Sequence, residues 1–466
     1  MNAPALGSPF EAELDGPFDG RADVEGALPS WLRGRLLRSA PALFEVGGWA
    51  ASHWFDGFAM LYRLDLGDDG VRFAQRLLEC GSLDEARRGR LAMSTFATPN
   101  QRSLWRRIFE PIPKMTDNAN VHVVPTPDGW LAMTETETQL LIDGETLKTR
   151  RAVRYDDAVG KGLGMLAHPE RDGRALVNLA FKIGPRAEII AYRQLVGSYT
   201  REPIGKISLP ELPYIHAFGL TPTKIVIVAP PLLAKPTSML WSNAGYIDHF
   251  RWRPERTTRI FTIDRATGAS RVVELESFFM FHTLNAYDDG GDVVVDVSAY
   301  RDTRVIDRLR METLRDEFFT PTELVRLRVP AKGGRATRAT LDRESLEFPT
   351  VNRAVVGGRR HRLAWGTALG VEAGRPTSRV RRLDLESGAS STFRRDDVVY
   401  GEPVFVRRPR TTIEDDGVLL VVGSDVAKRR AELVILDARS LEPVATARLP
   451  IALPLGFHGS FARERV

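Results

Sequence analysis

Short strands of alternating or continuously apolar residues recur along most of the chain. LYRLDL (61–66) and ELVRLRV (323–329) alternate, whereas KIVIVAP (224–230), DVVVDVS (292–298) and GVLLVVG (417–423) are almost continuously apolar. Strands buried on one face alternate, and strands buried on both faces read as apolar runs. Turn sequences such as PDG, DDGG, KGG, ESG and EDDG separate these runs. The pattern predicts an all-β chain.

Helical patterns are few. Three stretches have helical spacing: 82–93 (SLDEARRGRLAM), 101–110 (QRSLWRRIFE) and 302–317 (DTRVIDRLRMETLRDE). Residues 1–35 are rich in turn formers and are expected to form an extended lead-in. Because large all-β folds can run long as one unit, we expect a single domain over residues 1–466.

One short pattern, apolar-Asp-x-x-Thr/Ser, recurs between strands. It occurs at IDGET (142–146), IDRAT (263–267), LDLES (383–387) and LDARS (436–440), and each aspartate is expected to bond the backbone of a hairpin tip. Asp143, Asp264 and Asp384 are 121 and 120 residues apart, which suits a unit of about 60 residues counted twice. The repeat therefore indicates a β-propeller, and seven such blades would nearly account for the chain.

Composition restricts the class of protein further. The chain has 65 basic and 60 acidic residues, a net charge of +5, and no basic stripe interleaved with aromatic residues, so we expect no nucleic-acid partner. A single cysteine, Cys80, allows no disulfide within the chain and suits a reducing compartment. The N-terminus lacks the features of a signal peptide, and the apolar run 225–234 is too short to span a bilayer. These features predict a cytoplasmic protein, unless it lies on a membrane.

Four of the eight histidines lie among apolar and small residues next to a strand or turn: His168, His216, His282 and His458. Burying an unpartnered imidazole costs about 1–3 kcal/mol. Two interpretations follow. Each ring could be a hydrogen-bonded core residue, or the four could together bind iron, zinc or copper, for which imidazole is a suitable ligand.

The other four histidines have different surroundings. His249 and His361 lie among charged residues and are expected to be solvated. His53 and His122 lie near strand starts, and the sequence leaves their role undecided. No catalytic triad motif, phosphate-binding loop or dinucleotide fingerprint is present in the sequence.

A series of motifs resembles the carotenoid cleavage oxygenases in order and spacing. They are GRLLRSAPALFE, HWFDGFAML, TFATPN, TDNANVHVVP, MTET, LAHPE, YIHAFGLTP, FFMFHTLNAYDD, LEFPTVN, GEPVFVRR, EDDG and GFHGSF. The resemblance implies a seven-bladed propeller with a dome of loops and helices over an axial metal. It also implies one Fe(II) per chain, bound by His168, His216, His282 and His458.

The resemblance assigns further residues. Glu135, Glu347 and Glu402 match the glutamates that hold His216, His282 and His458, whereas His168 would have no glutamate partner. A carboxylate that accepts the far ring N–H fixes the tautomer and raises the basicity of the ligand. The aromatic residues that match the wall of the family's substrate cavity are Phe55, Phe96, Phe281 and Phe348.

The resemblance implies a dioxygenase that cleaves a C=C bond of a carotenoid or apocarotenoid. Four neutral ligands would leave two positions on the iron, both oxygen atoms of O2 would enter the products, and no other electron donor would be required. Residues 230–250 match a region that dips into the membrane in the family, so a monotopic contact is expected there. No protein partner is expected.

Two departures from the family pattern and three alternatives accompany this prediction. SAPA (39–42) replaces the usual N-G-P-G, which puts that turn in doubt. Thr134 stands where stilbene-cleaving relatives have a phenol-binding lysine, which argues against a phenolic stilbene substrate. The alternatives are a retinoid or carotenoid isomerase on the same fold, a stilbene-cleaving dioxygenase, and a propeller binding module whose histidines are structural.

Overall fold

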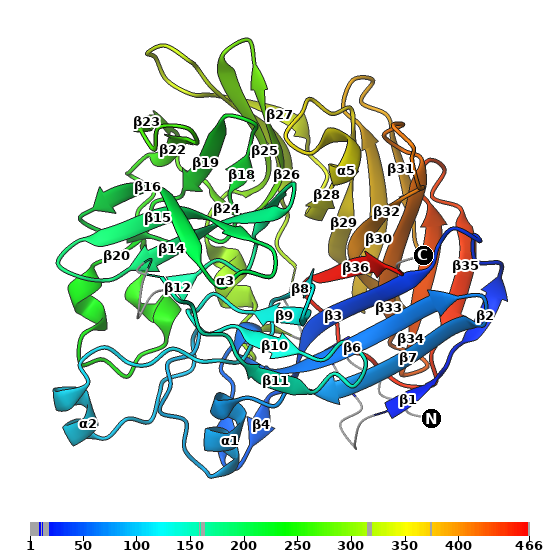
Figure 1. Cartoon of the computed structure of the whole chain (residues 1–466), viewed down its shortest axis with the longest axis horizontal. Helices are drawn as coiled ribbons and strands as arrows, with labels where there is room; N and C mark the ends of the chain where they lie inside the picture. Colours follow the sequence, from blue (N-terminus) through cyan, green and yellow to red (C-terminus); the bar gives the residue numbers. More distant parts are fainter. Residues whose placement is uncertain are drawn as a thin grey trace.

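Seven antiparallel sheets of four or five strands form the blades of a β-propeller (Figure 1). The computed structural model describes residues 9–10, 12, 18–157, 159, 164–314, 319–372 and 375–464. The strands of each blade are given in order of pairing. The first blade is β1 (Phe18–Arg21), β7 (Gly70–Leu77), β6 (Phe58–Gly67), β3 (Gly34–Leu43) and β36 (Gly459–Arg463), and the second is β11 (Thr149–Ala152), β10 (Leu140–Ile142), β9 (Gly129–Met133) and β8 (His122–Thr126). The third has β12 (Gly164–Met165) and β13 (Glu170–Asp172) paired with β14 (Ala175–Lys182), followed by β15 (Ala187–Leu195) and β16 (Arg201–Leu209), and the fourth is β18 (Gly219–Leu220), β19 (Lys224–Ala229), β22 (Thr258–Asp264) and β23 (Ser270–Leu275).

The remaining blades continue around the ring in chain order (Figure 1). The fifth blade is β24 (Phe279–Asp289), β25 (Asp292–Tyr300), β26 (Glu323–Val329) and β27 (Thr337–Asp342), and the sixth is β28 (Glu347–Thr350), β29 (Leu363–Glu372), β30 (Arg375–Asp384) and β31 (Ser390–Phe393). The seventh is β32 (Val398–Arg407), β33 (Gly417–Asp425), β34 (Arg430–Asp437), β35 (Pro443–Arg448) and β2 (Asp23–Gly26). The prediction of a seven-bladed propeller is confirmed.

The two ends of the chain close the ring. β2 comes from the N-terminal region and pairs with β35 of the last blade, and the C-terminal β36 pairs with β3 of the first blade. Each of these two blades therefore contains strands from both ends of the chain. Within the expected extended lead-in 1–35, Phe18–Arg21 and Asp23–Gly26 are the blade strands β1 and β2. Residues 1–8, 11 and 13–17 of the lead-in lie outside the described part.

The repeated aspartates occupy equivalent places in different blades. Asp143, Asp264, Asp384 and Asp437 each accept backbone N–H groups two and three residues further on, at distances of 2.8–3.2 Å. Their turns join the third and fourth strands of the second, fourth, sixth and seventh blades. The spacings of 121 and 120 residues thus correspond to two blades each, as the repeat predicted.

The core lies between adjacent blades. The middle strands β25 and β33 are buried along nearly their whole length, because both of their faces pack against other side chains. The outer strand β23 alternates between exposed and buried residues. The apolar runs of the sequence therefore mark middle strands of the blades. The expectation of burial on one face is wrong for LYRLDL (61–66), which lies in β6 and is almost completely buried.

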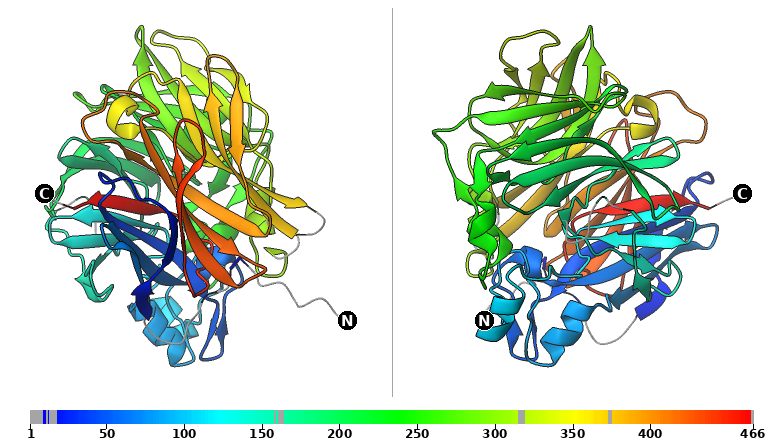
Figure 2. Two further views of the ribbon diagram at one scale, coloured as in Figure 1. Left: turned by 90° about the vertical axis from the view of Figure 1, so that its right-hand side faces the viewer. Right: turned by 60° about the vertical axis from the view of Figure 1, so that its left-hand side comes forward.

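The helices are shorter than the sequence predicted. α1 (Gly81–Arg87), α2 (Leu104–Phe109) and α3 (Arg304–Arg308) lie within or beside the three expected stretches, of which residues 315–317 lie outside the described part. α1 ends early because Gly89 adopts a left-handed conformation (φ +81°) and its N–H bonds the carbonyl of Ala86. A further helix, α5 (Arg353–Val356), lies at the opposite end of the molecule from α1 and α2 (Figure 2).

Short elements outside the blades lie on the loops that surround the site. They are β4 (Glu45–Val46) with β5 (Trp49–Ala50), β17 (Leu212–Pro213) with β20 (Leu232–Ala234) and β21 (Arg251–Trp252), and the 3-10 turns η1 (Trp54–Asp56), η2 (Pro236–Met239) and η3 (Tyr246–His249). Together with α1, α2 and α3 they correspond to the dome that the resemblance implied.

Candidate metal centre

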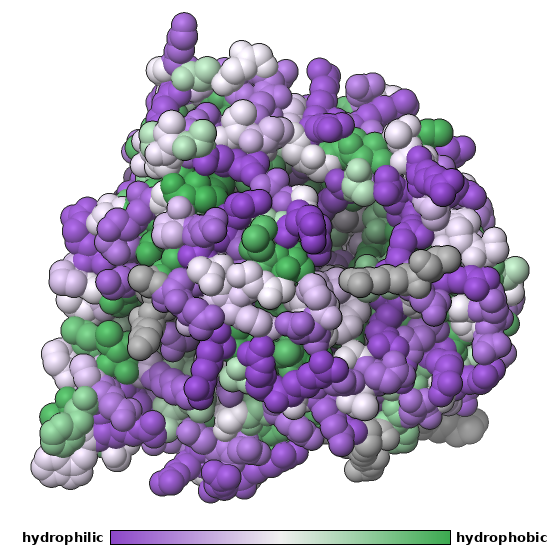
Figure 3. Space-filling model, viewed as in Figure 1, coloured by the Kyte–Doolittle hydropathy of each residue, from purple (hydrophilic) through white to green (hydrophobic). Residues whose placement is uncertain are grey.

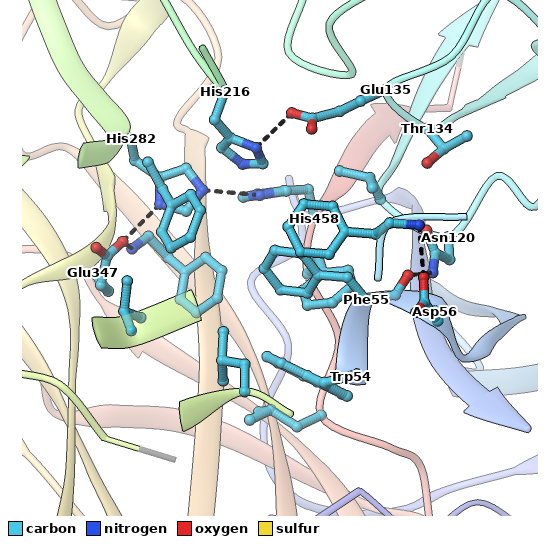
Figure 4. A pocket seen from close by; sticks show the side chains of 18 of the residues that line it. Trp54, Phe55, Asp56, Asn120, Thr134, Glu135, His216, His282, Glu347 and His458 are labelled. Atoms are coloured by element: carbon cyan, nitrogen blue, oxygen red, sulfur yellow. Dashed lines mark hydrogen bonds and ion pairs between the residues drawn. The ribbon is translucent and has the colours of Figure 1, made fainter. Parts of the chain in front are cut away.

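The four histidines of the apolar segments meet at one point. His168 lies between β12 and β13, His216 precedes β18, His282 lies in β24, and His458 immediately precedes β36. One ring nitrogen from each histidine lies within 4.8 Å of the other three. Figure 4 shows His216, His282 and His458 turned toward a common centre beside a pocket.

Three glutamates fix the orientation of three of these rings. The Nδ1 atoms lie 2.6 Å from Glu135 Oε1 in His216, 2.6 Å from Glu347 Oε2 in His282 and 2.8 Å from Glu402 Oε1 in His458. A carboxylate accepts the ring N–H, so the proton of each neutral imidazole is on Nδ1. Among the described residues no carboxylate is hydrogen-bonded to His168.

With their protons on Nδ1, His216, His282 and His458 present the lone pairs of Nε2 to the centre. His168 Nε2 lies 2.9 Å from His216 Nε2, and His282 Nε2 lies 3.2 Å from His458 Nε2. Facing lone pairs at such distances repel unless a cation lies among them. Neutral imidazoles whose far N–H groups are held by carboxylates are the donor set that a divalent transition metal requires, so the residues fit the iron that the resemblance implied.

Burial keeps two of these rings neutral. It lowers the pKa of His168 and of His458 well below the ordinary histidine value, and the neighbouring histidines of the cluster lower both further. Burial raises the pKa of Glu402, an effect that the charge of Arg38 opposes. Neutral imidazole is the form that binds a metal.

Bulges in the inner strands direct three of the site residues. In the pairing of β24 with β25, two residues (281–282) lie opposite one, so the side chain of His282 is turned toward the axis. Comparable irregularities follow Glu347 in β28 and precede Pro403 in β32, next to Glu402. Phe348, beside Glu347, has a positive φ of 49°, which is rare for a bulky residue.

An apolar pocket adjoins the centre, and His216, His282 and His458 line it (Figure 4). All four phenylalanines singled out by the resemblance line it: Phe55, Phe96, Phe281 and Phe348. The Phe55 and Phe96 rings are 5.0 Å apart, and Phe281 and Phe348 lie 5.2 and 5.4 Å from the rings of His216 and His282. Their contact with a substrate stays a prediction.

Several residues of this pocket were not identified from the sequence. They are Trp54, Asp56, Asn120, Tyr246, Tyr300, Leu455 and Phe457, whereas Thr134, which the sequence did single out, also lines the pocket. The Asp56 carboxylate is buried and accepts the backbone N–H groups of residues 96–98 and the hydroxyl of Thr98. It thereby fixes the loop that carries Phe96. Its position one residue after Phe55 in HWFDG was the available signal.

The two undecided histidines are both buried or partly buried near the site. His53 bonds the carbonyl of Ile306 (2.9 Å) and accepts the N–H of Phe55 (3.0 Å), and burial lowers its pKa to about 3. His122 Nδ1 lies 2.9 Å from the carbonyl of Ala167, next to His168. Both rings therefore brace segments that carry site residues.

The expectation of solvated rings is wrong for His361. Its side chain is fully buried, 3.3 Å from Asp296, which also pairs with Arg326. The arginines around it in the sequence point elsewhere, so their charge gave a misleading signal. His249 is partly buried rather than fully exposed.

The exposed apolar surface differs from the expected one. Residues 230–250 are largely buried, and Trp241, 52% exposed, is their large apolar side chain at the surface. The other exposed apolar side chains nearby belong to 104–112: Leu104, Trp105, Ile108, Phe109 and Ile112. They project at the corner of the molecule where α2 lies (Figure 3). Within the described part of the chain, no helix has the length and apolar character to cross a bilayer.

Residues 7–463 match the family model described as retinal pigment epithelial membrane protein. A curated relative, carotenoid cleavage dioxygenase 8 homolog A of Oryza sativa subsp. japonica, is 32% identical over 95% of this chain and 85% of its own. The carotenoid isomerooxygenase of Galleria mellonella is 29% identical over 98% and 95%.

Solved structures give the same fold. The crystal structure of cobalt-substituted Synechocystis ACO, whose companion structures are titled apocarotenoid oxygenase, superposes with a TM-score of 0.86. It is 23% identical and covers 98% of both chains. The two proteins thus share the propeller fold.

Proposed function

The chain belongs to the retinal pigment epithelial membrane protein family, and from that premise we propose that it is an Fe(II)-dependent dioxygenase that cleaves a C=C bond of a carotenoid or apocarotenoid. The observation that carries the proposal is the convergence of four imidazole nitrogens beside an apolar aromatic pocket. The names of the relatives, a carotenoid cleavage dioxygenase and a carotenoid isomerooxygenase, support the substrate class.

His168, His216, His282 and His458 would hold the metal through Nε2. Glu135, Glu347 and Glu402 keep the proton of their histidine on Nδ1, so that three of the four lone pairs stay available at neutral pH. When bound, Fe(II) supplies the activation of dioxygen. Both atoms of O2 enter the two carbonyl products, so the reaction balances without a further reductant.

The pocket residues bind and orient the polyene. The rings of Phe55, Phe96, Phe281 and Phe348 offer apolar faces to an extended π-system, and the pocket wall beside the metal centre is mostly carbon. Aromatic faces also stabilise cationic character that develops along a polyene. The dry environment prevents water from competing with the reaction.

The exposed apolar side chains of α2, with Ile112 and Trp241, suit contact with a lipid surface that holds such a substrate. Trp105 and Phe109 are 71% and 79% exposed, and Arg106 and Arg107 of the same helix provide cationic groups beside them. A helix with apolar and basic residues lies in the membrane interface. The proposed membrane contact thus combines Trp241, from residues 230–250, with the exposed side chains of 104–112.

The test is product analysis under labelled oxygen. The iron-loaded protein is incubated with β-carotene and with apocarotenals under ¹⁸O2, and products are reduced at once to alcohols to prevent exchange with water. We expect two shorter products, each with one heavy oxygen. A product of unchanged mass would instead indicate the rival isomerase activity, and no product from any polyene would contradict the proposal.

A further inference from the structure

The three glutamates that hold the histidines have different partners on their second oxygen. Glu135 Oε2 accepts the hydroxyl of Tyr214 at 3.2 Å. Glu402 Oε2 accepts from the Arg38 guanidinium at 3.2 Å and from the backbone N–H of Gly459 at 3.1 Å. Glu347 Oε1 is buried without a hydrogen-bond partner among the described residues. One carboxylate of the three is therefore paired with a cation.

Arg38 is a buried residue of the site, held by several hydrogen bonds. Its side chain is 1% exposed, and it comes from β3, in the middle of the first blade. Besides Glu402 it donates to the hydroxyl of Tyr62 and to the carbonyls of Glu402 and Phe457. A buried arginine with so many fixed partners keeps its charge at one position.

The charges of the side chains around the centre sum to −2, which would neutralise a divalent cation. Three carboxylates contribute −3 and Arg38 contributes +1, which leaves −2 next to four neutral imidazoles. The nearby Glu170 and Arg353 form an ion pair of their own at 2.9 Å and cancel. Asp56, on the pocket wall, directs its charge at the N–H groups of residues 96–98.

We propose that Arg38 is a positioning residue that sets this charge balance, so that the centre favours a divalent over a trivalent metal. The proposal rests on the metal site of the proposed function. Without Arg38 the surrounding charge would be −3, which matches Fe(III). The positive charge of Arg38, on the far side of Glu402, thereby favours Fe(II), the form of iron that binds dioxygen.

The proposal predicts an order of reduction potentials. Across roughly 10 Å at an effective dielectric constant near 20, one unit charge changes the Fe(III)/Fe(II) equilibrium on the order of tenfold. A tenfold change corresponds to about 59 mV for a one-electron couple. Arg38→Met should lower the potential by about this amount, and Glu402→Gln should raise it by about this amount.

The double variant separates charge from structure. Arg38→Met combined with Glu402→Gln removes one charge of each sign and restores −2, so its potential should return to within about threefold of the parent equilibrium. Arg38→Lys, which retains the cation, should behave likewise. A purely structural Arg38 would give a double variant at least as perturbed as Arg38→Met.

The experiment is an anaerobic potentiometric titration of the iron-loaded full chain, followed by the electron paramagnetic resonance of Fe(III). Co²⁺ binding to the parent protein is measured first, and its absence would remove the metal site and with it the proposed function. With Co²⁺ bound, equal potentials in all variants would overturn the role of Arg38 alone. If Arg38→Met does not bind iron, the other two single variants decide. A raised reduction potential in Glu402→Gln together with an unchanged potential in Arg38→Lys supports the proposal, and any other pair of results overturns it.

Discussion

His53 couples the stability of the dome to pH. Its side chain is completely buried and bonds the carbonyl of Ile306 in α3 and the N–H of Phe55 in η1. Burial lowers its pKa from 6.5 to about 3. The folded protein therefore cannot protonate this ring at a pH where the unfolded chain can.

The sign and size of the effect follow from the two pKa values. Below 6.5 the unfolded state binds the proton and the folded state does not, so stability is lost as the pH falls from 6.5 toward about 3. For this one group the loss is about 0.1 kcal/mol at pH 7.5 and about 1.4 kcal/mol at pH 5.5. Other buried histidines add to the slope of the parent protein, so a variant is needed to isolate His53.

The assay is urea unfolding at pH 7.5 and at pH 5.5, on the parent and on His53→Asn. Asparagine retains an acceptor at this helix N-cap but has no titrating group. We expect the free energy of unfolding to fall between the two pH values by about 1.3 kcal/mol less in the variant than in the parent. An equal fall in both proteins would refute the buried, neutral state of His53.

Three further predictions concern the pocket, the centre and the surface. Asp56→Asn places an amide NH₂ against a backbone N–H of residues 96–98 and should cost about 2–4 kcal/mol of stability and raise KM. Asp157, outside the pocket, accepts backbone N–H groups and also pairs with Arg201. Asp157→Asn should therefore destabilise the protein without changing KM, and equal KM values in both variants would contradict the role of Asp56. Glu347→Gln should retain iron but lose about 10- to 100-fold in activity or metal affinity, because glutamine holds the Nδ1–H of His282 less strongly. Metal analysis and turnover measure this, and unchanged values would contradict the role of Glu347 in holding His282. Trp105→Glu should weaken sedimentation with anionic vesicles and leave turnover of detergent-dispersed substrate unchanged, and undiminished binding would exclude α2 from the membrane contact.

The sequence carried the architecture because blades are locally encoded. Each aspartate of the repeat bonds its own turn, and the apolar runs correspond to strands buried on both faces. The four clustered histidines were also recognisable from their apolar neighbours. Their number, rather than the surroundings of any one ring, made a shared site a reasonable interpretation.

Features that depend on distant contacts were not predictable. His361 follows two arginines in the sequence, yet the chain buries it against Asp296, 65 residues away. The spacing of 101–110 predicted a helix, but whether its apolar side chains would be covered depends on the packing of other loops. Arg38 contacts Glu402 across 364 residues, and nothing in its local pattern indicates that pairing.

Metal analysis tests the central claim most directly. The full chain is purified without added iron or chelator and is also reconstituted with Fe(II) under anaerobic conditions, beside His216→Ala. We predict about one iron per chain in the parent and a loss of most of it in the variant. An absence of iron before and after reconstitution would contradict the metal centre and leave the four histidines as packing residues of a binding module.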